Sequence, residues 1–143
     1  MSLFCLLSVS ASGMAAQRTR AELLVENLAN AETTRTPEGG PYRRKDAVFT
    51  SQPVTSEFSS VFSSVARTPS TGVAVSEIVI DARDPEKRYQ PGHPDADGYV
   101  AFPRVSPAED MVDLLGAARG YQANVAAITA AKDMIQRSID LLR

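Results

Sequence analysis

The sequence contains one cysteine, one histidine and no tryptophan among its 143 residues. A single cysteine excludes a disulfide within the chain, and one cysteine with one histidine cannot build a structural zinc site. A nucleophilic pair would need Cys5 and His93, which lie in unlike segments and have no recognisable residue to orient them. The sequence therefore predicts that the protein is not an enzyme and that it binds no metal and no cofactor.

The sequence also lacks a clear excess of positive or of negative charge. With 15 basic and 17 acidic residues the net charge is −2, so a surface for nucleic acid is not expected. The apolar stretch Met1–Val9 has no lysine or arginine before it. It is short for a signal peptide and far too short to cross a bilayer. We expect neither a cleaved signal peptide nor direct membrane insertion.

The N-terminal residues follow a heptad pattern with two apolar rows, which predicts a helix over residues 3–29. One row holds Phe4, Ala11, Arg18 and Val25, and the other holds Leu7, Met14, Ala21 and Leu28. Asn30 is a suitable residue to end this helix, and Pro37 follows soon after. A helix of this length would be about 40 Å long, which is long for a small globular protein.

The C-terminal residues repeat the pattern. Ser106 is a good N-cap, Pro107 suits the first turn, and Glu109 stands where a capping box places an acid. One row holds Met111, Ala118, Val125, Lys132 and Ile139, and the other holds Leu114, Tyr121, Ile128, Ile135 and Leu142. We therefore expect the two terminal helices to pair along these rows.

The middle of the chain has few helix-forming residues. Within 31–71 the sequence is rich in Gly, Pro, Ser and Thr, and it predicts extended loop with one short strand near Ala47–Ser51. Val73–Asp81 and Tyr99–Val105 are typical of strands. The predicted fold is α+β, with an antiparallel coiled coil of two long helices and a small β-rich and extended middle. Its segments are a helical arm (1–30), a loop (31–71), a β hairpin element (72–105) and a second helical arm (106–143).

Many apolar residues fall outside the predicted rows. They are Leu3, Leu6, Val9, Leu23 and Leu24 near one end, and Val112, Leu115, Met134 and Leu141 near the other. A two-helix hairpin would leave many of them in water, in a patch larger than monomers usually expose. Small residues also form a stripe on the second helix (Gly116, Gly120, Ala123, Ala127 and Ala130 or Ala131). Each glycine costs about 1 kcal/mol there, which close approach of another helix would explain and tolerated flexibility would also allow. We interpret both features as signs of a multi-helix assembly in which folding is completed by neighbours.

Four motifs, in order, resemble the bacterial flagellar rod and hook proteins. Glu26–Thr34 resembles their N-terminal signature, and Thr36–Lys45 resembles the proximal rod members in particular. Tyr89–Val100 and Gly120–Asn124 resemble the middle and the last helix of the same family. The resemblance covers nearly the whole chain, least so between about Ser51 and Thr71. One departure is the turn at Asp97–Gly98, which is tighter than the family's acidic turn.

The resemblance implies a structural subunit of the proximal rod of the flagellar basal body. Such a subunit would assemble helically in the periplasm with copies of itself, other rod proteins and the rod-base adapter protein, and would transmit motor torque. It would leave the cytoplasm through the flagellar type III export apparatus without a cleaved signal peptide. We expect the assembly interface to use Phe4, Leu7, Met14, Val25, Asn27, Leu28, Asn30, Tyr42, Arg43, Arg44, Leu114, Tyr121, Gln122, Asn124, Val125, Ile128 and Ile135.

Three other interpretations stay open. His93–Gly98 has oxygen ligands and a glycine, as in part of a calcium loop, but Arg104 stands where the distal acid is required. Tyr42–Lys45 is basic enough for a phosphate or nucleic-acid patch, although salt bridges to a neighbouring subunit explain it better. The alternative function is a small secreted binding module or hydrolase.

Overall fold

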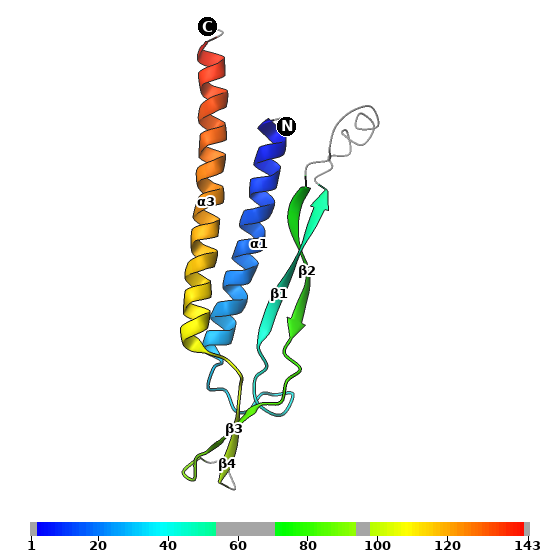
Figure 1. Ribbon diagram of the computed structural model, residues 1–143, viewed down its shortest axis with the longest axis vertical. Coiled ribbons are helices and arrows are strands. Elements are labelled where there is room, and N and C mark those ends of the chain that lie inside the picture. The colour runs from blue at the N-terminus through cyan, green and yellow to red at the C-terminus, as the bar shows by residue number, and fades with distance from the viewer. Residues whose placement is uncertain (1–2, 54–70, 94–97, 142–143) are drawn as a thin grey trace.

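A computed structural model of the chain describes residues 3–53, 71–93 and 98–141 (Figure 1). Its elements, in chain order, are α1 (Leu3–Ala29), β1 (Lys45–Pro53), β2 (Thr71–Ile80), β3 (Glu86–Tyr89), β4 (Tyr99–Phe102) and α3 (Pro107–Asp140). The helix α1 lies between α3 on one side and the β1–β2 ribbon on the other. The β3–β4 hairpin projects from the end at which α3 begins. The fold is α+β, as the sequence predicted.

Both helices start and end close to the predicted residues. The side chain of Asn30 donates from Nδ2 to the Glu26 carbonyl (2.9 Å) and so satisfies an exposed carbonyl at the end of α1. At the start of α3, the Asp110 amide donates to the Ser106 carbonyl (3.0 Å). The Ser106 side chain makes no capping hydrogen bond, so the predicted capping box is wrong. The helix nevertheless begins at the residue that the sequence predicted.

The two helices run antiparallel and meet through amide side chains that pack on glycines. A Cβ added at Gly13 would lie 3.0 Å from Asn124 Oδ1, and one added at Gly120 would lie 3.2 Å from Gln17 Cδ. Each helix therefore carries a glycine and, four residues later, an amide that covers the other helix's glycine. Because both contacts depend on a missing side chain, they fix the register of the pair.

One predicted row on each helix is not at the contact between them. Met111, Ala118, Val125, Lys132 and Ile139 are exposed on α3, as are Ala11, Arg18 and Val25 on α1. The contact instead uses small residues one heptad position earlier on α3, such as the buried Ala117 and Ala131. The prediction failed because it searched for large apolar side chains, whereas close helix packing here selects small ones.

The β1–β2 ribbon is antiparallel and lies beside α1, and its two strands twist around each other (Figure 1). Alternate β1 residues Lys45, Ala47 and Phe49 are half-buried, and they line one hollow with Leu24 of α1. At the other end of the ribbon β2 is the strand that contacts α1, and the Val73 amide donates to Ser12 Oγ (3.0 Å). The last five residues of β2 are consequently left exposed.

Strand pairing differs from the prediction. β1 is longer than the short strand expected near Ala47–Ser51, and β2 pairs with β1 instead of with the strand at 99–102. The latter pairs with β3, which the sequence did not predict because Glu86–Tyr89 is charged and has no apolar alternation. A hairpin does lie within 72–105, but it is formed by β3 and β4 and does not include β2. Residues 54–70, in the predicted loop, lie outside the described residues.

Leu23 and Leu24 are buried within the chain, although they fall outside the predicted rows. The reason is that α1 is covered on two sides, by α3 and by the ribbon. The corresponding residues of α3 (Val112, Leu115, Met134 and Leu141) are exposed. The expectation that neighbours must cover such residues therefore applies to α3 and not to this part of α1.

Candidate assembly interface

Asn27 joins the end of α1 to the start of β1. Its side chain is fully buried and donates from Nδ2 to the Lys45 carbonyl (2.8 Å). Its Oδ1 accepts from the Lys45 amide (2.9 Å) and from the Tyr42 hydroxyl (2.9 Å). The Asn27 carboxamide thus makes with the backbone of Lys45 the two hydrogen bonds that a residue of a neighbouring antiparallel strand would make. Burial, followed by the nearby carboxylate of Glu26, raises the pKa of Tyr42 to about 12.

A buried ion pair joins the same region to the start of α3. Arg44 Nη1 lies 2.7 Å from Oδ1 of Asp110, whose side chain is 1% exposed. Neither Asp110 oxygen receives a well-aligned hydrogen bond from the described residues. Burial raises the pKa of the Asp110 carboxyl, and Arg44 opposes that effect. Arg44 also contacts Asp46 at 3.0 Å, and this second carboxylate helps to keep the guanidinium charged.

These contacts correct one expectation. The basic residues after Tyr42 were expected to form salt bridges to a neighbouring subunit, but Arg44 pairs with Asp110 and Asp46, and Lys45 Nζ lies 2.5 Å from Glu26 Oε1. Arg43 is exposed and donates from Nη1 to the Asp81 carbonyl at 3.4 Å. The pairs within the chain tie α1, β1 and α3 into one junction.

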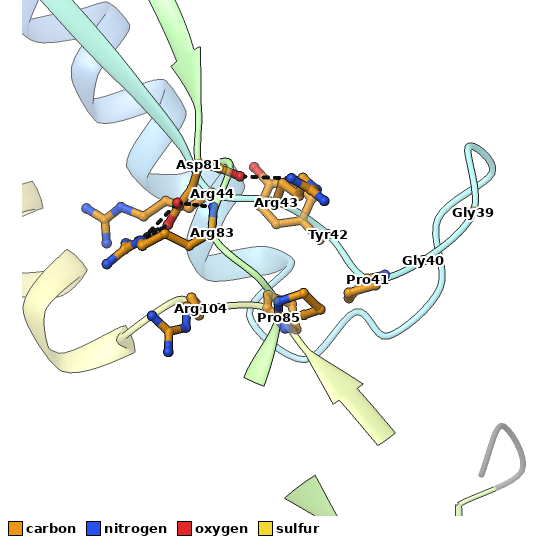
Figure 2. Close-up of a pocket in the computed structure, with 11 residues that line it drawn as sticks. Gly39, Gly40, Pro41, Tyr42, Arg43, Arg44, Asp81, Arg83, Pro85 and Arg104 are labelled. Carbon is orange, nitrogen blue, oxygen red and sulfur yellow. Dashed lines mark hydrogen bonds and ion pairs between the residues drawn. The ribbon is translucent and has the colours of Figure 1, made fainter. Parts of the chain in front are cut away.

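Beside this junction is a small hollow of about 90 Å³, shown in Figure 2. Asp81 and Arg83, which both line it, form a bidentate pair, with Nη2 of Arg83 2.5 Å from Oδ2 and Nε 2.9 Å from Oδ1 of Asp81. These bonds from Arg83, and a further one from its backbone amide, lower the pKa of Asp81 to about 2. The hollow is smaller than a typical small-molecule site, and its carboxylate is already paired.

The remaining predicted interface residues are spread along both helices. Leu7, Met14, Leu28, Leu114, Asn124, Ile128 and Ile135 are half-buried, whereas Val25, Tyr121, Gln122 and Val125 are exposed. The Phe4 side chain lies outside the described residues. Asn124 donates to the Gly120 carbonyl (2.9 Å) of its own helix while it packs on Gly13. The structure thus brings together Asn27, Tyr42 and Arg44, but not the whole set.

Sequence reasoning assigned no packing role to Gln17, which covers Gly120, or to Asp110, which pairs with Arg44. A usable signal was present for Asp110, because Asp110, Ala117, Asn124 and Ala131 are spaced by sevens in a row of small and polar residues.

Two exposed apolar faces lie on opposite sides of the molecule. On α3, Val112 is 68% and Leu115 is 60% exposed. On the ribbon, Val79 and Ile80 are exposed at the end of β2. None of the helices in the described ranges combines the length and apolarity needed to cross a membrane. Across the same ranges no three His, Cys, Asp or Glu side chains gather as a metal-binding group, and residues 94–97 of the calcium-like motif lie outside them.

Comparison with known proteins gives the family. A family described as "Flagellar basal body rod FlgEFG protein C-terminal" matches residues 96–141. The chain is 40% identical to the flagellar basal-body rod protein FlgC of Bacillus subtilis, over 99% of each chain. It is 34% identical to FlgC of Borreliella burgdorferi, over 100% of this chain and 99% of the relative. It is 35% identical to FlgC of Salmonella typhimurium, over 99% of this chain and 98% of the relative.

Similarity along the full length of both chains confirms the resemblance that the four motifs carried and gives no support to a secreted binding module or hydrolase. The chain belongs to the FlgC family of flagellar basal-body rod proteins, which are structural proteins and not enzymes.

Proposed function

We propose that this chain is a structural subunit of the proximal rod of the flagellar basal body. It assembles helically with copies of itself and with other rod proteins, including the adapter protein at the rod base, and it transmits torque across the periplasm. It reaches that position through the flagellar type III export apparatus without a cleaved signal peptide. Family membership supports the rod, and the finer partners and route are part of the proposal.

The observation that carries the proposal is the uncovered apolar face of α3. Ala117 and Ala131 are buried against α1, whereas Met111, Val112 and Leu115 are exposed. Rows of this kind are costly in water and are typical of surfaces that bind other proteins. A subunit that gains cover for these residues from its neighbours is stabilised by assembly.

We also infer that α1 and α3 form an antiparallel coiled coil in the rod. Asp110, Ala117, Asn124 and Ala131 recur every seven residues on the contact side of α3. The reciprocal glycine contacts at Gly13 and Gly120 oppose sliding of one helix along the other. Such a pair transmits load along its axis because slipping would break both contacts at once.

A pair of substitutions tests the proposal. In a strain whose only copy of the gene carries Leu115→Asp, we expect loss of swimming and loss of the chain from isolated basal bodies. The isolated variant should keep its helical circular dichroism because Leu115 is exposed. Thr129→Asp, an exposed change on the same side of α3 but about 21 Å farther along the helix, is the matched control and should swim. Normal swimming and assembly of the Leu115→Asp strain would refute the proposal.

A further inference from the structure

The two exposed apolar faces are matched to each other. We define the α3 patch as Val112, Leu115 and Arg119, and the β2 patch as Val48, Glu77 and Val79. We propose that the α3 patch of one copy packs against the β2 patch of the next copy, so that subunits join side by side. This proposal rests on the proposed function and names the surface by which copies of the chain meet.

The positions of the patches allow this contact. α1 separates α3 from the ribbon, and in the described residues the backbone of α3 does not come close to that of β1 or β2. Both patches lie near the end of the molecule at which α3 begins, on its two opposite sides (Figure 1). A sideways shift of one copy, with only a small rise along the helix axis, therefore brings one patch to the other.

The α3 patch faces away from α1. Leu115 and Arg119 are four residues apart and so share one side of the helix. Ala117, which is 1% exposed, lies on the opposite side against α1.

The β2 patch faces away from α1 as well. Ala47 and Phe49 point toward α1, so Val48 between them points outward. Glu77 pairs with Val48 and shares its face, and Val79 follows Glu77 by two residues. Val79 is 42% exposed on this outward face, whereas the neighbouring Ile80 belongs to the other face of the ribbon.

The spacing within the two patches is the same. From Leu115 to Arg119 the helix rises about 6 Å, and from Val79 to Glu77 the strand rises about 6.8 Å. Because α3 and β2 run in opposite directions, parallel copies place Leu115 against Val79 and Arg119 against Glu77.

The charges are complementary. Glu77 and Arg119 are both exposed, and neither has an ion-pair partner among the residues that the structure describes. The other residues of the two patches are apolar, and the nearby Asp46, which is opposite Val79, already pairs with Arg44. The Glu77–Arg119 pair therefore sets the alignment of the two patches. A contact between two different surfaces is heterologous and propagates into an open helix when it does not close into a ring, which is the geometry a rod requires.

Disulfide cross-linking in assembled basal bodies tests the proposal. The parent variant is Cys5→Ser, which removes the single cysteine. Adding Leu115→Cys and Val79→Cys to the same chain should give, on oxidation, a ladder of dimers, trimers and longer species, because each copy bonds to two neighbours. Thr129→Cys with Val79→Cys is the control, since residue 129 lies about 21 Å farther along the helix, and it should give no ladder.

A charge exchange tests the alignment. Arg119→Glu and Glu77→Arg alone should each lower the amount of chain in basal bodies by about two- to fivefold, and the double variant should restore it. Arg137→Glu is the control, because it reverses the charge of another exposed arginine of α3 that lies outside the α3 patch. Glu77→Arg should not restore the amount of this variant in basal bodies.

Several results would overturn the proposal. Dimers from Leu115→Cys alone would show that the α3 patches of two copies meet each other. Assembled basal bodies in which Leu115→Cys with Val79→Cys gives no ladder would show that the α3 patch and the β2 patch do not meet. Absence of the Cys5→Ser parent chain from basal bodies would instead refute the proposed function, and this inference with it.

Discussion

Replacing Asn27 should destabilise the protein more than its small side chain suggests. The carboxamide is completely buried and makes three hydrogen bonds, two with the Lys45 backbone and one with the Tyr42 hydroxyl. Each bond contributes about 1 kcal/mol, and Asn27→Ala leaves its buried partners unsatisfied. We therefore expect the free energy of unfolding to fall by about 3 kcal/mol and the melting temperature by about 6–12 °C.

Chemical and thermal denaturation followed by circular dichroism measure this loss. Asn30→Ala is the control, because Asn30 is half-buried and water can replace its bond to Glu26, so it should cost about 1 kcal/mol. Tyr42→Phe should cost about 1 kcal/mol alone and much less in the Asn27→Ala background, since the shared bond is already lost. A loss for Asn27→Ala no greater than that for Asn30→Ala would refute the reasoning.

Three further predictions concern the junction and the helix pair. Arg44→Met should cost about 3–5 kcal/mol because it leaves the Asp110 charge buried and unpaired. Asp110→Asn should cost less because Arg44 keeps Asp46, and equal losses in urea titrations of the two variants would contradict this. Gly116→Ala should stabilise the protein by up to about 1 kcal/mol, since a Cβ there meets nothing within 4 Å. Gly13→Ala should gain less or be destabilising, because its Cβ would meet Asn124 at 3.0 Å, and calorimetry giving both variants the same gain would show that this contact is absent in solution. In a carbon-detected NMR titration Asp81 should have a pKa of about 2, below its ordinary 3.8, so the stability from its pair with Arg83 is present above about pH 4 and is lost as the pH falls toward 2. A midpoint near 3.8 in the folded protein would contradict the bidentate pair.

The bounds of both helices could be predicted from the sequence because heptad spacing, a proline at the first turn and an asparagine at the end are local signals. The contact between the helices could not. It depends on Gly13, Gln17, Gly120 and Asn124, whose packing leaves no trace in a pattern of large apolar residues. The exposed row at Met111 and Val125 was selected for the helix pair in their place, although it faces solvent.

The pairing of strands was also beyond local reasoning. β2 has the β-branched composition of a strand, but its partner depends on where the chain returns, and that partner is β1. The role of Asn27 lay within a motif that the sequence analysis singled out. Its three bonds could not be predicted because their other members, Tyr42 and Lys45, are 15 and 18 residues away.

The different coverage of the two helices bears on how the sequence can change over evolution. α1 is covered on two sides by elements of its own chain, so a substitution at its buried Leu24 can be compensated within the same gene product. On the open side of α3, a substitution at Leu115 changes a surface that the chain does not cover. A substitution at that position must be compensated by a change on the surface that covers it. The two helices should therefore diverge between bacterial lineages at different rates, and their substitutions should correlate with those at different positions.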